Sequence, residues 1–224
     1  MRRLTFSYSY LLIVLIALIA RPSLSNAQGG VGGQASATAP QLPANIEVVV
    51  SRFLDSARAR GLPTSAITSK AAEGVLKGAD SARIVSAVRK LFDELDSARK
   101  TLGPGAPSAE LVAAASALHA GVTPAQLAHV AQLGSGPGKP ERLVMPLVVL
   151  ADLVARRVST DVAVASLETL LARAAPDAEY ATLRTAIERD IANGTSPDAA
   201  MRARSAAVVR TLDAKGGGVR PPED

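Results

Sequence analysis

The chain has 224 residues, no cysteine and no tryptophan, and its 25 Lys and Arg residues exceed its 20 Asp and Glu residues, giving a formal net charge of +5. The lack of cysteine excludes disulfide bonds, thiolate metal ligands, a cysteine nucleophile and a lipoprotein anchor. Residues 1–27 hold three arginines and no acid, so the 22 basic and 20 acidic residues of the remaining chain nearly balance. That part of the chain also has only three aromatic residues, and its composition therefore does not favour nucleic-acid binding.

The first 27 residues have the three parts of a secretory signal peptide. Arg2 and Arg3 form a positive start, Leu11 to Ala20 is an uncharged apolar run, and Ser25-Asn26-Ala27 supplies small residues for cleavage. The apolar run is shorter than the roughly 20 residues of a membrane-spanning helix. High alanine, arginine and valine usage favours a bacterial source, so we expect a periplasmic or secreted protein that uses the general secretory route. Twin-arginine export, and retention of the segment as a membrane anchor, are the alternatives.

The rest of the chain divides by composition. Residues 28–44 contain Gly, Ala, Ser and Pro without charge, which predicts a flexible linker. Residues 214–224 contain three consecutive glycines and end in Pro-Pro-Glu-Asp, which predicts a disordered tail. Residues 45–213 are rich in the helix formers alanine, leucine and arginine, and they are numerous enough for one hydrophobic core. We therefore predict one all-helical domain over 45–213.

Helix boundaries in this domain are marked by capping residues. Thr123-Pro124 and Ser196-Pro197 each place a hydroxyl at an N-cap and a proline at the first helical position, and Gln126 completes a capping box with Thr123. Further N-cap candidates are Asp80, Ser108, Ser159 or Thr160, and Asp177, and glycines that should end helices are Gly78, Gly121 and Gly194. The predicted helices cover 45–60, 64–77, 80–102, 108–120, 124–133, 143–156, 160–174, 177–193 and 197–213.

Two of these helices have distinctive apolar patterns. The helix over 80–102 carries a stripe at alternating spacings of four and three residues, which must be covered by other residues. We expect neighbouring helices of the same chain to cover it, with a homodimer interface as the alternative. The segment Leu143 to Ala155 is apolar on all sides except at Asp152, which predicts a central helix with Pro146 in its first turn. The stripe consists of Ile84, Val88, Leu91, Leu95, Ala98 and Leu102.

The segment Glu73-Gly74-Val75-Leu76-Lys77-Gly78, followed by Arg83-Ile84 and Ala87-Val88, resembles a pattern in uncharacterised exported α-helical proteins of bacteria. The resemblance covers about 20 residues and implies no activity. Structural roles account for the residues themselves. Glu73 and Lys77 form an i,i+4 pair, Gly74 permits close approach of another helix, and Gly78 can end the helix.

The helix junctions also repeat. Junctions at Gly121, Arg157 and Gly194 begin 36 and then 37 residues apart, which is one helical hairpin per period. The junction at Gly78 lies 43 residues before Gly121, so the period is loose. We therefore predict an all-α fold, an irregular bundle of short helical hairpins, with a solenoid-like stack of hairpins as the alternative.

Candidate sites are few. His119 and His129 could face each other across a hairpin, but no carboxylate lies near them in the sequence, so we predict neither a metal nor a catalytic role. Asp152 would be a functional candidate if it were enclosed, and we expect it instead at the domain edge beside Arg156 or Arg157. The stretch Gly134 to Lys139 is interpreted as a turn rather than a phosphate loop, and Asn193-Gly194-Thr195 as a helix cap rather than a glycosylation site.

These patterns contain no catalytic, cofactor-binding or metal-binding residues that we can assign. The leading hypothesis is an exported, non-enzymatic interaction module or scaffold of the bacterial envelope, with a protein partner or a second copy of itself and no nucleic acid. The first alternative is binding of an apolar small molecule or lipid within the bundle. An enzyme based on scattered carboxylates is the third, and it would need Asp152 to face Glu168 or Glu188 in a deep pocket.

Overall fold

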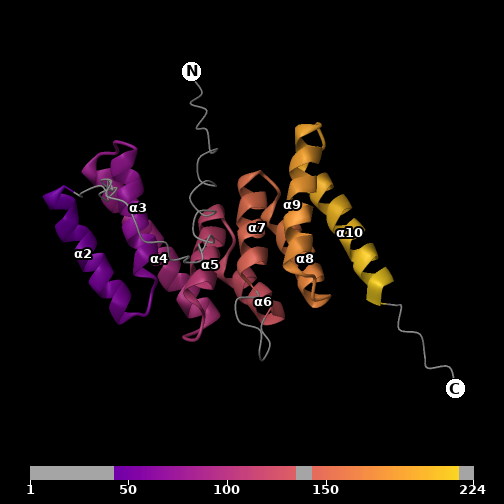
Figure 1. Cartoon of the computed structure of the whole chain (residues 1–224), viewed down its shortest axis with the longest axis horizontal. Helices are drawn as coiled ribbons and strands as arrows, with labels where there is room; N and C mark the ends of the chain where they lie inside the picture. The colour runs from indigo at the N-terminus through magenta and orange to yellow at the C-terminus, as the bar shows by residue number, and fades with distance from the viewer. Residues whose placement is uncertain (1–42, 135–142, 217–224) are drawn as a thin grey trace, which may run out of the picture. The chain divides into compact units, whose positions relative to one another are not determined.

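A computed structural model describes residues 43–134 and 143–216 of the chain. The described helices all belong to one compact unit, residues 40–224. The predicted signal peptide and nearly all of the predicted linker, the stretch 135–142 and the end of the predicted tail from 217 onward lie outside the described residues. The helices are α2 (Ala44–Ala59), α3 (Thr64–Leu76), α4 (Ser81–Leu102), α5 (Ser108–Ala120), α6 (Pro124–Gly134), α7 (Val144–Ala155), α8 (Thr160–Ala172), α9 (Asp177–Ala192) and α10 (Pro197–Gly216) (Figure 1).

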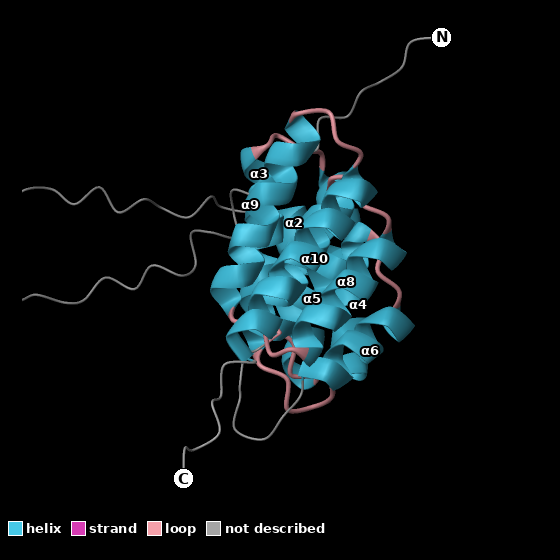
Figure 2. Ribbon diagram, turned by 90° about the vertical axis from the view of Figure 1, so that its right-hand side faces the viewer, coloured by secondary structure: helices cyan, strands magenta, loops and turns pink. Residues whose placement is uncertain are grey.

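The described residues are all-helical, which confirms the predicted fold class, and the helices form two layers. Within one layer α2, α4, α6, α8 and α10 contact one another in series, and within the other α5, α7 and α9 do so. The consecutive helices α4 and α5, α5 and α6, α7 and α8, and α9 and α10 also pack together, while α3 packs on α2 and α4. A view along the array places α3 and α9 on one side and α4, α6 and α8 on the other (Figure 2). Contacts between each helix and the next but one are the pattern of stacked helical hairpins.

Six of the helices end in the same turn. In this Schellman motif the second residue after the C-cap donates its N–H to a carbonyl five residues back, and the residue between them has a positive φ. The predicted glycines Gly78, Gly121 and Gly194 occupy that position, as does Gly61. At the ends of α7 and α8 the same position holds Arg157 (φ 72°) and Ala174 (φ 53°), where no glycine marks the turn in the sequence. The repeated turn returns the chain at regular intervals and so produces the stacked hairpins.

The N-terminal caps agree in part with the predictions. Asp80 accepts a hydrogen bond from the backbone N–H of Arg83, and Thr123 forms the predicted reciprocal capping box with Gln126. Ser108 and Asp177 are instead the first residues of their helices, because prolines occupy the N-cap positions before them. Ser159 is at the N-cap of α8, but its side chain makes no cap hydrogen bond.

The stripe on α4 is covered by helices of the same chain, as expected. Ile84, Val88, Leu95 and Ala98 are buried, and the remaining stripe residues pack partly buried against the core. Helix α4 contacts α2, α3, α5 and α6, which accounts for this burial. A Cβ atom on Gly74 of α3 would lie 2.7 Å from Cγ1 of Ile84, so close helix approach explains that glycine.

Helix α7 is central, as its apolar sequence predicts. It packs on α5, α8 and α9, and Pro146 lies in its first turn, where the missing N–H leaves no helical hydrogen bond unmade. Its buried side chains include Leu147, Leu150 and Leu153, and also Asp152. Among the described residues, none of the helices combines the length and apolar character that crossing a bilayer would need.

Candidate functional site

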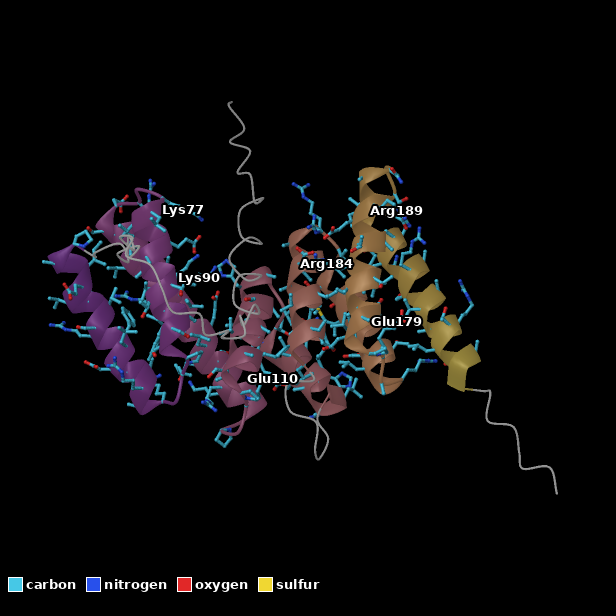
Figure 3. The ribbon with its side chains drawn as sticks, in the orientation of Figure 1. Lys77, Lys90, Glu110, Glu179, Arg184 and Arg189 are labelled. Atoms are coloured by element: carbon cyan, nitrogen blue, oxygen red, sulfur yellow. The ribbon has the colours of Figure 1, made fainter. Side chains whose placement is uncertain are left out.

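A cluster of four charged side chains, built around the buried Asp152, lies between α7 and α9. Asp152 of α7 is buried, and its Oδ2 atom accepts a hydrogen bond from Nε of Arg156 at 3.0 Å. Arg156 also reaches Oε1 of Glu188 on α9, with Nη2 at 2.9 Å. Arg184 of α9 lies between the two acids, with its Nε 3.4 Å from Glu188 and 4.0 Å from Asp152. Figure 3 shows Arg184 beside α7.

This ion cluster corrects one expectation and confirms another. Asp152 does not lie at the domain edge, because the turn that follows α7 returns the chain and α9 covers that face. Its predicted partner Arg156 is present, whereas Arg157 takes the positive-φ position of the turn. Glu188 faces Asp152 through the two arginines, and Glu168 pairs elsewhere.

The cluster has the composition of a structural clamp. Two carboxylates and two guanidinium groups balance in charge, and Oδ2 of Asp152 and Oε1 of Glu188 each have a cationic neighbour. The contacts of Arg184 Nε and Glu188 Oε1 are ion pairs without hydrogen-bond geometry. Arg156 and Arg184 lie between the two carboxylates and connect one helix to the other. The arrangement therefore fits a link between α7 and α9 better than proton transfer.

The two histidines each have a carboxylate partner that the sequence analysis did not anticipate. Nδ1 of His119 lies 2.8 Å from Oε1 of Glu94 on α4, and Nδ1 of His129 lies 2.8 Å from Oε1 of Glu168 on α8. The sequence around the histidines contains no carboxylate, and the partners come from other helices, 25 residues away for His119. Within 43–134 and 143–216, the structure gathers no three His, Asp or Glu side chains that could hold a metal ion.

The interface between α8 and α10 is polar and more exposed. The backbone N–H and hydroxyl of Ser159 both donate to Asp198, at 2.7 and 2.9 Å, and these hydrogen bonds hold the pKa of Asp198 below its usual 3.8. Nearer the other end, Nε of Arg173 donates to Asp213 at 2.9 Å. The residue numbers rise together along both helices, so α8 and α10 run parallel.

In the middle of this interface two serines meet. The Oγ atoms of Ser166 and Ser205 lie 3.4 Å apart. The corresponding α6–α8 interface is bridged by larger groups, with the amide of Gln126 donating to Asp161 at 3.0 Å in addition to the pair of His129 with Glu168. The α8–α10 interface is therefore less filled on its outer side.

An open hollow of about 470 Å³ lies at this place. Arg210 borders it and has no hydrogen-bond or ion-pair partner among the residues that the structure describes. We name this hollow the α8–α10 groove and define it by its lining residues, Ala165, Ser166, Thr169, Ser205, Ala206, Val209 and Arg210. A second open hollow, of about 390 Å³, is lined by residues of α4, namely Ser81, Ala82, Val85, Ser86 and Arg89.

Glu110 has a structural role that the sequence analysis missed. It is buried on α5, and its carboxylate accepts the backbone N–H of Leu143 at 3.2 Å, which satisfies one of the free N–H groups at the start of α7. Figure 3 shows Glu110 on α5. Gly134 packs tightly here as well, since a Cβ atom on it would lie 2.1 Å from Leu143. The rest of the predicted turn up to Lys139 lies outside the described residues.

The short motifs have structural explanations. Glu73 forms ion pairs with Lys77 and, at 3.0 Å, with Lys70. Desolvation on burial raises the pKa of Glu73, but the contacts with the two lysines together outweigh it, so the pKa is lowered overall. Asn193 is the C-cap residue of α9 and precedes the positive-φ Gly194, as the helix-cap interpretation requires.

Comparisons of the chain with protein-family models, with curated proteins and with solved structures found no match.

Proposed function

We propose that this protein is an exported, non-enzymatic helical scaffold that binds a protein partner on the outer surface of its helix array. The observation that carries the proposal is the α8–α10 groove, an open hollow between two parallel helices at the end of a layer. Parallel helices with small side chains between them form the kind of groove in which a further helix packs. Stacked hairpins commonly bind partners over such extended surfaces.

The arrangement of the charges supports a binding role over a catalytic one. The carboxylates of the α7–α9 ion cluster are neutralised by arginines. Glu94 and Glu168 are paired with histidines, and Asp190 is held by two hydrogen bonds from Arg204, at 2.6 and 2.7 Å. These groups link helices, and so they stabilise the array on which the groove lies.

Export is the second part of the proposal, and it rests on the sequence of residues 1–27. The positive start, the short apolar run and the small-residue site are those of a cleavable signal. N-terminal sequencing of exported protein should begin near Gln28. An intact Met1 on membrane-held protein would contradict this part and leave the binding role to be tested separately.

Native mass spectrometry of the protein purified from its host tests the binding role. We expect a complex with a polypeptide that dissociates under collisional activation. A copurified lipid or apolar small molecule in place of a polypeptide would contradict the scaffold function and support the apolar-ligand alternative. Turnover of a substrate by the purified protein would contradict the non-enzymatic assignment.

A further inference from the structure

We draw no further inference here: the strongest candidate, the open hollow along α4 that Ser81, Val85 and Arg89 help to line, carries none, because nothing in the structure shows what covers it.

Discussion

The α7–α9 and α8–α10 interfaces join helices at equivalent places in the two layers, yet they use charge in opposite ways. Between α7 and α9, the buried Asp152 meets two partly exposed arginines and Glu188 in a cluster of balanced charge. Between α8 and α10, polar bonds lie near the two ends and two serines meet in the middle, beside Arg210, whose side chain has no partner among the described residues. Enclosed charge fixes the distance between helices, whereas small side chains leave room for another molecule. We therefore expect the first interface to contribute more to stability and the second to be the one that carries the proposed binding role.

The largest expected effect tests the stabilising interface. Asp152→Ala leaves two arginines facing one carboxylate, and we expect the free energy of unfolding to fall by about 3 kcal/mol, the lower end of the range for breaking a buried ion pair. Urea unfolding followed by circular dichroism measures it. Asp213→Ala removes an exposed pair of the α8–α10 interface and should cost less than about 1 kcal/mol. Equal losses in the two variants would remove the proposed distinction between the interfaces.

Substitutions in the turns have an intermediate expected effect. Ala174 ends α8 with a positive φ, which is unfavourable for a residue with a Cβ, so Ala174→Gly should raise the free energy of unfolding by about 0.5–1 kcal/mol. Arg157→Gly at the end of α7 should do the same, because the turns are alike in both layers. Gly121→Ala makes the opposite change where a Cβ would meet no atom within 4 Å, and it should cost about 1 kcal/mol. Thermal unfolding of the three variants checks these signs, and a loss on Ala174→Gly would show that the turn is not strained.

The smallest expected effect concerns pH. The pKa of Asp198 is lowered by the backbone N–H and hydroxyl of Ser159, so folding favours its ionised form. This contribution is present above the ordinary Asp pKa of 3.8 and is lost as the pH falls through the lower value of the folded state. Asp198→Asn should therefore reduce stability slightly at neutral pH and flatten its decline in acid, as chemical unfolding at pH 7, 4 and 3 would show. An unchanged acid profile in Asp198→Asn would mean that this end of the α8–α10 interface contributes no such linkage.

The helices could be predicted because their boundaries are encoded locally. Asp80, Thr123-Pro124 and Gly121 carry out their capping roles with residues no more than five positions away. The end of α8 was predicted two residues too late, at 174 instead of Ala172, because an alanine rather than a glycine takes the positive-φ position.

The interfaces between helices could not be predicted in the same way. Glu168 bonds His129 and Asp198 bonds Ser159 from 39 residues away, and each pair is visible only once the hairpins are stacked. The one sequence signal was the junction spacing of 36 and 37 residues, which is close to the separations of the bonds between parallel helices, 35 for Gln126 with Asp161 and 40 for Arg173 with Asp213. That period indicates which helices are neighbours, but it does not say which side chains meet or where a groove stays open.

Hydrogen–deuterium exchange of the protein, alone and with the polypeptide that copurifies with it, tests the central claim most directly. The account predicts slower exchange on complex formation in α8 and α10, with little change in α7 and α9. Protection of α7 and α9 instead, or no protection in any helix, would contradict the assignment of binding to the α8–α10 interface.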